Sequence, residues 1–441
     1  MKNRDLELLS IVSKSNGVSI DTRSLKKGEV FFALKGDNFD GNIFVKKALE
    51  KGAAMVVASD TSFLSFPQVT VIKDTLKTLQ NIAKLHRDKL NIPVIGLTGT
   101  NGKTTTKELL CSILSSQNNI SCTKGNFNNH IGVPLTLLKI KEEHQLAVVE
   151  MGAGNIGEID FLCKLADPTH GLITSIGIAH IEGFGSLQNI INTKLELYQY
   201  LKANSGVFFY NSEIKEMEDY MGDYERLMRF SAASMKGKNI SKIVLNKSFP
   251  FLTVSLHTKN GEIVKVKTNL YGEYNFINIV NAVKVSDYFD ISIENIKKGL
   301  ENYNPENNRS QLVNWNSNEL IMDAYNANPT SMKLALETFE NVKSNKNKYL
   351  VLGDMLELGD VSLPEHRGIL MQLKNKNFFT KSIFIGNEFQ KARENINDLD
   401  KSMIFVENAK EAKKILDMLQ IRNSMILVKA SRGIRAETIF E

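Results

Sequence analysis

Short apolar runs alternate with longer amphipathic stretches along almost the whole chain. This rhythm is typical of strands that are connected by crossover helices, so it predicts an α/β protein built on parallel sheets. Within the first 90 residues, the pattern predicts two strands, two helices and a turn. These are strands at 30–34 and 54–58, helices at 43–51 and 75–90, and a turn at 36–41.

The same rhythm continues through two further regions, which a polar, proline-containing stretch at 301–308 separates as a linker. The first region predicts strands at 94–98, 146–150, 171–176 and 206–210, and a hairpin in 243–270 around Asn260-Gly261. The second region predicts strands at 350–352, 382–385, 403–406 and 425–428. We therefore predict three domains, at 1–90, 91–306 and 307–441.

Composition narrows the class of protein. The 441 residues suffice for about three domains, and 42% hydrophobic with 24% charged residues excludes a disordered or fibrous chain. The 55 basic and 49 acidic side chains leave a net charge of +6, which permits anionic small ligands without requiring nucleic acid. No apolar run approaches the ~20 residues of a membrane span. Acidic residues inside the first apolar stretch exclude a signal peptide.

The three cysteines are Cys111, Cys122 and Cys163, and they form neither a C-x-x-C pair nor a metal-binding spacing. A sparse, odd count is typical of a reducing compartment, and a chain of this length needs no disulfide to stabilise its core. We therefore expect free thiols in a cytoplasmic protein.

The strongest motif is Gly-Leu-Thr-Gly-Thr-Asn-Gly-Lys-Thr-Thr at 96–105, which follows an apolar strand and opens a helix. Its spacing is shorter than that of the usual P-loop, because position 97 is Leu and the glycine stands at Gly99. Backbone N–H groups of such a loop can surround phosphate oxygens, Lys103 can reach the β and γ phosphates, and the Thr104 hydroxyl can bind Mg²⁺. The alternative is a glycine-rich turn with an incidental lysine, but the flanking strand and helix favour ATP binding. The loop residues predicted to bind ATP are Gly99, Thr100, Asn101, Gly102, Lys103, Thr104 and Thr105.

Three further side chains are candidates for chemistry. Glu150 ends an apolar strand, where a carboxylate beside a P-loop can hold Mg²⁺, although a strand-end glutamate alone is more often a surface charge. His180 follows the apolar stretch 172–178 and can bind a metal or orient a substrate, although a lone histidine is more often structural. Lys194 lies in a predicted helix and by itself would be a solvated lysine.

These residues together resemble the Mur ligase superfamily, the ATP-dependent amino-acid ligases of cell-wall precursor synthesis. The short loop T-G-T-N-G-K-T-T, Glu150 and the block of Gly177–His180 with Lys194–Glu196 are typical of it. Further stretches resemble the branch that joins D-alanyl-D-alanine to UDP-N-acetylmuramoyl-tripeptide. They are 21–23 with 36–41, 124–134, 150–153, 323–329 and 352–359, of which D-A-Y-N-A-N-P at 323–329 is the most specific.

The resemblance runs from about residue 19 to 436 and implies a three-domain architecture, with a central P-loop parallel-sheet ATPase domain and a Rossmann-like C-terminal domain. The sequence departs from the pattern of the branch at Asn42, Ser175, Tyr274 and Asn308. None of these four is needed to bind phosphate or metal.

The resemblance also assigns roles to residues. It places Lys103, His180 and Lys194 in catalysis, with Thr104 and Glu150 on the Mg²⁺ beside ATP. His180 and a carbamylated Lys194 would serve a second Mg²⁺, because CO₂ turns a neutral lysine amine into a carboxylate-like anion. The further nucleotide contacts that it implies are Asn275, Asn278, Arg309, Asp323, Tyr325 and Asn326.

The substrates follow in the same way. The N-terminal domain would hold the uridine diphosphate through Thr22, Arg23, Gly36 and Gly41, and the central domain would contact the nucleotide-sugar substrate through the pair Asn128-Asn129. D-alanyl-D-alanine would enter between the central and C-terminal domains of a monomer. Two alternatives stay open, a sibling ligase that adds a single amino acid and a non-catalytic nucleotide-binding scaffold. The absence of an Asp-x-x-His block near Asp323 argues against the first, and the intact set of catalytic residues argues against the second.

Overall fold

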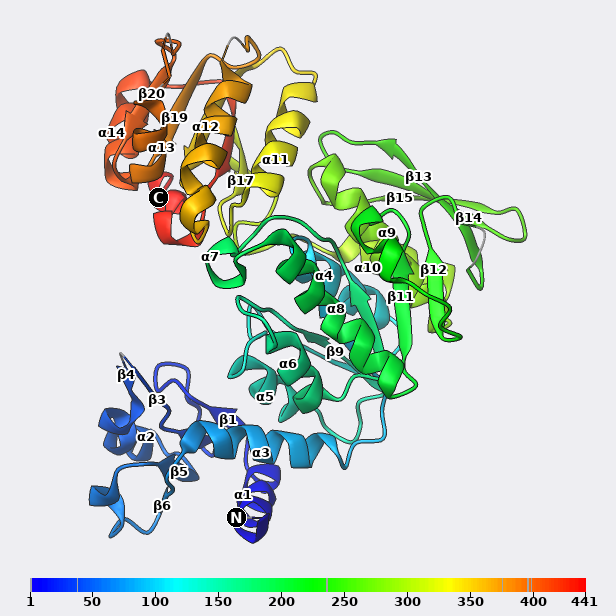
Figure 1. Ribbon diagram of the computed structural model, residues 1–441, viewed down its shortest axis with the longest axis vertical. Coiled ribbons are helices and arrows are strands. Elements are labelled where there is room, and N and C mark those ends of the chain that lie inside the picture. Colours follow the sequence, from blue (N-terminus) through cyan, green and yellow to red (C-terminus); the bar gives the residue numbers. More distant parts are fainter. Residues whose placement is uncertain (1, 38, 235–236, 375, 395, 398) are drawn as a thin grey trace.

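The computed structural model describes residues 2–37, 39–234, 237–374, 376–394, 396–397 and 399–441. Figure 1 shows three units in a row, with the N-terminal unit at one end and the C-terminal unit at the other. Each unit is built on its own mainly parallel sheet, so the α/β architecture with three sheet-based units is confirmed.

The N-terminal unit has a four-stranded parallel sheet in the order β1-β2-β5-β6. Its strands are β1 (Val18–Ser19), β2 (Val30–Phe32), β5 (Met55–Ala58) and β6 (Val69–Val71), with a small antiparallel pair of β3 (Lys35–Gly36) and β4 (Phe39–Asp40). Its helices are α1 (Lys2–Lys14), α2 (Val45–Glu50) and α3 (Thr75–Arg87). Asn38, in the predicted turn, lies outside the described residues.

The central unit has a six-stranded parallel sheet in the order β12-β11-β10-β7-β9-β8 and a three-stranded antiparallel sheet of β13, β14 and β15. The parallel strands are β7 (Val94–Thr98), β8 (Ile120–Cys122), β9 (Leu146–Glu150), β10 (His170–Ile173), β11 (Val207–Asn211) and β12 (Leu227–Phe230). The antiparallel strands are β13 (Ile240–Lys247), β14 (Thr253–Thr258) and β15 (Ile263–Lys267).

Two apolar cores cover the two faces of the large central sheet. One is filled by α4 (Lys103–Leu114), α9 (Phe276–Tyr288) and α10 (Ile293–Asn302). The other is filled by α5 (Gly132–Leu137), α6 (Glu158–Ala166) and α8 (Leu187–Ala203). The short helix α7 (Ile181–Phe184) precedes α8 and lies toward the C-terminal unit in Figure 1.

The C-terminal unit has a six-stranded sheet in the order β16-β17-β21-β18-β19-β20, in which only the β16–β17 pair is antiparallel. The strands are β16 (Gln311–Trp315), β17 (Asn318–Asp323), β18 (Asn347–Gly353), β19 (Lys381–Ile385), β20 (Met403–Val406) and β21 (Ser424–Lys429). Its helices are α11 (Pro329–Asn341), α12 (Ser362–Leu373), α13 (Asn387–Arg393) and α14 (Ala409–Leu419).

Most predicted strands agree with the structure to within a few residues, and the hairpin around Asn260-Gly261 is the β14–β15 pair. The linker prediction was wrong at its start, because α10 continues to Asn302. Strands β16 and β17 were not predicted. They are an antiparallel pair at the edge of a parallel sheet, where the strand–helix rhythm that guided the prediction is interrupted.

The expectation of three free thiols was wrong. Cys111 on α4 and Cys122 on β8 form a disulfide with a Cα–Cα distance of 6.5 Å, and only Cys163 is free and buried. The chain leaves α4, turns and returns as β8 along the edge of the sheet, so two cysteines that share no motif become neighbours.

Candidate active site

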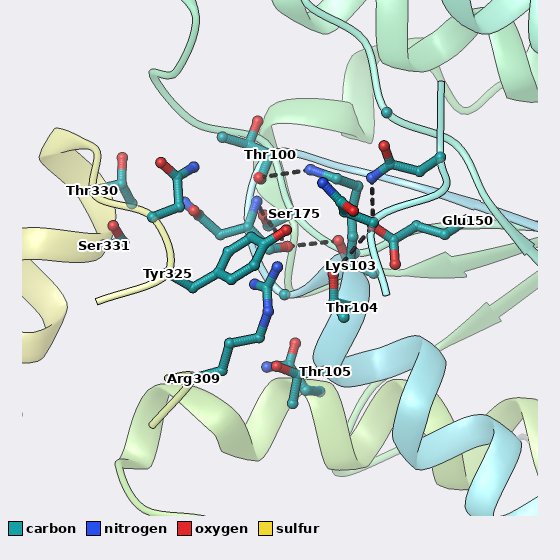
Figure 2. Close-up of a pocket in the computed structure, with 18 of the residues that line it drawn as sticks. Thr100, Lys103, Thr104, Thr105, Glu150, Ser175, Arg309, Tyr325, Thr330 and Ser331 are labelled. Carbon is teal, nitrogen blue, oxygen red and sulfur yellow. Dashed lines mark hydrogen bonds between the residues drawn. The ribbon is translucent and has the colours of Figure 1, made fainter. Parts of the chain in front are cut away.

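A cavity of about 450 Å³ lies where the central unit faces the C-terminal unit. The carboxyl ends of β7 and β9 open into it from one side and the end of β17 from the other, and ligands of α/β sheets bind at such strand ends. Figure 2 shows Lys103, Thr104 and Glu150 across the cavity from Arg309 and Tyr325. Six of the seven residues of the predicted phosphate loop line the cavity, and Gly99 does not.

Two glycines give the loop between β7 and α4 its shape. Gly99 and Gly102 have φ angles of 146° and 78°, which favour glycine, and Gly102 is the N-cap of α4. A Cβ atom at Gly102 would collide with the side-chain oxygen of Asn278 on α9. The turn thus aims the free N–H groups of the first turn of α4 at the cavity, where they can bind an anion.

The residues after β10 hold this loop in place. The backbone N–H of Thr100 donates to the Ser175 carbonyl at 2.9 Å, and that of Asn101 donates to Ser175 Oγ at 2.8 Å. Thr174 Oγ1 donates to the Asn101 carbonyl at 2.6 Å. Ser175, where the sequence departs from the pattern of the branch, therefore supports the loop directly.

Glu150 lies at the carboxyl end of β9 and is almost fully buried. Its Oε1 accepts hydrogen bonds from Thr104 Oγ1 at 3.1 Å and from Asn128 Nδ2 at 2.7 Å. Its Oε2 has no hydrogen-bond partner among the described residues, although Lys107 Nζ lies 3.8 Å away. A buried carboxylate oxygen that lacks a partner beside a hydroxyl fits a Mg²⁺ ion, because such oxygens are its preferred ligands.

Burial shifts the pKa of two lysines of the central unit, Lys103, which lines the cavity, and Lys194 on α8, which does not line it. Burial lowers the pKa of Lys103 to about 8, against the opposing effect of Glu150, and its Nζ donates to the carbonyls of Gly99 and Thr100. Burial lowers the pKa of Lys194 to about 7, and the positive charge of Lys103 adds to this effect. Lys194 Nζ lies 5.3 Å from the ring centroid of Phe184. Glu196 and Glu158 act on its pKa in the opposite direction, but neither forms an ion pair with it in the described part of the chain.

His180 lies at the start of α7 and also lines the cavity. Burial lowers the pKa of its imidazole, and its Nδ1 is paired with the carboxylate of Glu357 from the C-terminal unit, which acts in the opposite direction. Within the described part of the chain, no group of three or more His, Cys, Asp or Glu residues could hold a metal ion.

Asn275 and Asn278 lie below the loop, at the start of α9. Asn278 Nδ2 donates to Asn275 Oδ1 at 2.8 Å, while Asn278 Oδ1 accepts from Thr106 Oγ1 at 3.1 Å. Both asparagines are buried, so they fix the shape of this wall. Tyr274 beside them donates to or accepts from Ser310 Oγ at 2.8 Å, which links the central unit to the C-terminal unit.

The opposite wall comes from the segments before β16 and after β17. The guanidinium of Arg309 stacks on the ring of Tyr325 at 3.5 Å. Asp323 pairs with the buried Lys429 at 2.8 Å, and Lys429 also donates to the carbonyl of Asn326. Strand β17 thus delivers the predicted residues Asp323, Tyr325 and Asn326 to the same cavity as the phosphate loop.

The predicted substrate residues fall into two groups. The pair Asn128-Asn129 lines the cavity, whereas Thr22, Arg23, Gly36 and Gly41 lie in the N-terminal unit and do not line it. Gly41 packs so closely on the backbone of Leu34 that a Cβ atom would overlap it at 2.5 Å. The sequence analysis did not single out Lys107, although a lysine one helical turn after Lys103 faces the same side of α4.

Models of protein families match nearly the whole chain. The Mur ligase family catalytic domain matches residues 14–99, the Mur ligase middle domain matches 97–286 and the Mur ligase glutamate ligase domain matches 308–432. The UDP-N-acetylmuramoyl-tripeptide–D-alanyl-D-alanine ligase of Bacillus subtilis is 36% identical, over 96% of this chain and 92% of that protein. The chain belongs to the family of these Mur ligases. The enzyme of the same name from Haemophilus influenzae is 35% identical, over 80% of this chain and 77% of that protein.

Solved structures agree with this assignment. The crystal structure of MurF from Acinetobacter baumannii matches this Mur ligase with a TM-score of 0.79 and 31% identity, over 96% of this chain and 92% of that chain. MurF from Thermotoga maritima in complex with ADP has a TM-score of 0.78 at 24% identity, over 96% of both chains, and supports the fold. The expected three-domain Mur ligase architecture is therefore confirmed.

Proposed function

We propose that this Mur ligase joins D-alanyl-D-alanine to UDP-N-acetylmuramoyl-tripeptide at the expense of ATP, in the synthesis of peptidoglycan precursors. The observation that carries the proposal is the cavity in which the phosphate loop faces the Asp323–Asn326 segment. Relatives that are more than 30% identical over most of their length, each named for this reaction, support the choice of substrates.

The reaction has two covalent steps. A terminal carboxylate oxygen of the tripeptide attacks the γ-phosphorus of ATP, so ADP leaves and an acyl phosphate forms. The amine of D-alanyl-D-alanine then attacks the acyl carbon, loses a proton, and expels inorganic phosphate from a tetrahedral intermediate. The first step brings two anions together, so it requires positive charge around the transferred phosphoryl group.

The central unit supplies that charge. The N–H groups of the phosphate loop and the ammonium of Lys103 surround the β and γ phosphates. Lys103 now donates to two carbonyls of its own loop, so binding of ATP replaces those contacts with phosphate oxygens. We assign the walls formed by Asn275 and Asn278, and by Arg309 and Tyr325, to the rest of the nucleotide.

We assign Mg²⁺ to two places. Thr104 and Glu150 would hold one ion, which neutralises charge on the phosphates when it is bound. His180 and Lys194 would serve a second ion if Lys194 carries a carbamate. Lys194 is buried and forms no ion pair among the described residues, so a modification that makes it an anion would give it a role that an ammonium lacks.

The domain assignment follows from the same division. We assign residues 1–90, with Thr22, Arg23, Gly36 and Gly41, to the uridine diphosphate of the substrate. Residues 91–306 carry the ATP site and the pair Asn128-Asn129, and residues 307–441 close over it and admit D-alanyl-D-alanine. None of the described helices has the length and apolar character to cross a bilayer. We place the ligase in the cytoplasm as a monomer.

The test of the reaction is phosphate release from ATP and Mg²⁺ with purified protein. We expect release only when UDP-N-acetylmuramoyl-tripeptide and D-alanyl-D-alanine are both present. Release with a single L-amino acid on a shorter acceptor would show that the protein is a sibling ligase instead. Tight ATP binding without turnover on any acceptor would instead favour the scaffold.

The carbamate has a separate test. Removal of CO₂ from the buffer should slow the reaction, and added bicarbonate should restore it. The Lys194→Ala variant should be slow under both conditions, because it has no amine to modify. A wild-type rate that does not depend on CO₂ would contradict the proposed carbamate on Lys194, but it would not contradict the proposed ligase reaction.

A further inference from the structure

His180 lines the cavity and also takes part in a contact between the central and C-terminal units. Glu357 lies in the loop between β18 and α12, and its carboxylate is paired with His180 Nδ1. The backbone N–H of Glu182 on α7 also approaches the Glu357 carbonyl at 3.5 Å. No residue of the β18–α12 loop lines the cavity in the described part of the chain, so Glu357 meets the site only through His180.

Hydrogen bonds of residues 354–356 hold the loop that carries Glu357 in place. The buried imidazole of His366 accepts a hydrogen bond from the Met355 N–H at 3.0 Å through Nε2. Ser431 Oγ accepts from the Leu356 N–H, also at 3.0 Å. Asp354 accepts from two backbone N–H groups at the start of α13. A loop with this many fixed backbone contacts presents its next side chain in one direction.

Both partners of the contact have strained backbones. His180 has a φ of 52° and Glu357 a φ of 64°, in the left-handed region that residues other than glycine seldom adopt. Such strain persists only where the surrounding structure enforces it, and it gathers at functional sites. The two strained residues meet each other across the boundary between the units.

We propose that Glu357 is a positioning residue for His180. Its carboxylate accepts the proton of Nδ1 and so fixes the neutral imidazole in the tautomer that leaves the lone pair of Nε2 available to a ligand in the cavity. A carboxylate behind a histidine plays this part in many metal sites. The inference rests on the proposed function, because the ligand of Nε2 would be the second Mg²⁺ assigned above.

The arrangement has a consequence for the assembly of the site. Glu357 belongs to the C-terminal unit and His180 to the central unit, so the imidazole is oriented only while the two units are docked. Docking of the C-terminal unit therefore completes the metal side of the site, in addition to its contribution of Asp323 and Tyr325 on the nucleotide side.

The tautomer can be measured without metal or substrate. The chain has seven histidines, so ¹⁵N-histidine labelling gives a short NMR spectrum in which His180→Asn identifies the signals of His180. We expect His180 to carry its proton on Nδ1 in the wild type and to move toward the Nε2-protonated form in Glu357→Ala. Glu357→Gln keeps an oxygen that can accept the same hydrogen bond, so it should preserve the tautomer. Asp360→Asn, which alters another exposed carboxylate of the same loop, should change nothing.

Metal binding gives the second measurement. Mn²⁺ binding in the presence of ADP, followed by electron paramagnetic resonance, should weaken about 10-fold for one of the two ions in Glu357→Ala and less in Glu357→Gln, while the ion at Thr104 and Glu150 stays bound. The KM for ATP should stay near that of the wild type. An unchanged tautomer and an unchanged Mn²⁺ affinity in Glu357→Ala would overturn the proposal, even if X-ray scattering showed that the units separate. Because both readouts need no turnover, they stand or fall apart from the ligase assay.

Discussion

Two six-stranded sheets face each other across the cavity, one from the central unit and one from the C-terminal unit. The charged side chains on the two sides differ in the partners that they have. On the central side, Lys103 donates to two carbonyls of its own loop, and Glu150 has a carboxylate oxygen without a hydrogen-bond partner among the described residues. On the C-terminal side, Asp323 is paired with Lys429 and Arg309 is stacked on Tyr325.

The difference separates two tasks. Buried charges without partners cost stability, so they persist where a ligand supplies the missing charge. Charges that are already paired hold a surface in a fixed shape. We therefore propose that the central side binds the phosphates of ATP and that the C-terminal side forms a fixed wall for the rest of the nucleotide.

The largest effect should follow from removing a charge on the central side. Lys103→Ala should lower kcat/KM for ATP by about 1,000-fold, because it removes a cation from the transferred phosphoryl group. Phosphate release measures the loss, and the folding of the variant can be checked by thermal unfolding. Lys141→Ala, which removes an exposed lysine outside the cavity, is the matched control. Near-normal turnover in Lys103→Ala would contradict the proposal that the central side binds the transferred phosphoryl group.

A paired charge on the C-terminal side should matter for stability instead. Lys429→Met should lower the free energy of unfolding by about 3 kcal/mol, because it leaves Asp323 without its buried partner. Trp315 lies on β16 of the same sheet and is the chain's single tryptophan, so its fluorescence in urea follows this unit. Lys376→Met breaks an exposed pair with Glu340 and should cost below about 0.5 kcal/mol. Equal losses in the two variants would contradict the contrast.

The stacked wall should contribute a smaller amount. Tyr325→Ala should raise the KM for ATP about 10-fold, because Arg309 loses the ring that holds its guanidinium flat. Tyr325→Phe keeps the ring and should behave like the wild type. If both variants lost the same affinity, the hydroxyl rather than the stacked ring would be responsible.

The smallest effect should come from the hydrogen bond that joins the two sides. Asn328 caps α11 and also donates to Asn101 Oδ1 in the phosphate loop at 2.8 Å. Asn408 caps α14 in the same unit and has no such contact in the described structure. Replacement of either by Ala should cost about 1 kcal/mol of stability. Only Asn328→Ala should also raise the KM for ATP, by about threefold. A matching rise in Asn408→Ala would assign the effect to helix capping alone.

The sequence predicted those parts of the site that consecutive residues build. The phosphate loop is one, because its glycines and the start of α4 are neighbours in the chain. Glu150 could be expected at a strand end for the same reason. The support from Ser175 could not be foreseen, since its distance from Asn101 depends on how β10 pairs with β7.

Contacts between the units could not be predicted from the sequence, for a related reason. Nothing in the residues around His180 indicates that Glu357 lies against it, because the pair depends on how two separately folded sheets dock. The disulfide of Cys111 with Cys122 was missed because its two residues lie on a helix and a strand with no motif in common. The motif 323–329 was assigned by resemblance, and its place at the end of β17 could not be derived from hydrophobic periodicity.

The N-terminal unit is joined to the central unit by α3, where Arg87 donates to the carbonyls of Ala166 and Asp167 and Gln80 donates to that of His130. None of its described residues lines the cavity. A molecule that is recognised there must therefore reach the phosphate loop by its own length, with the reacting carboxylate at its far end. Under the assignment proposed above, in which the N-terminal unit binds the uridine diphosphate, a precursor with too short a peptide would bind through its nucleotide and would not react.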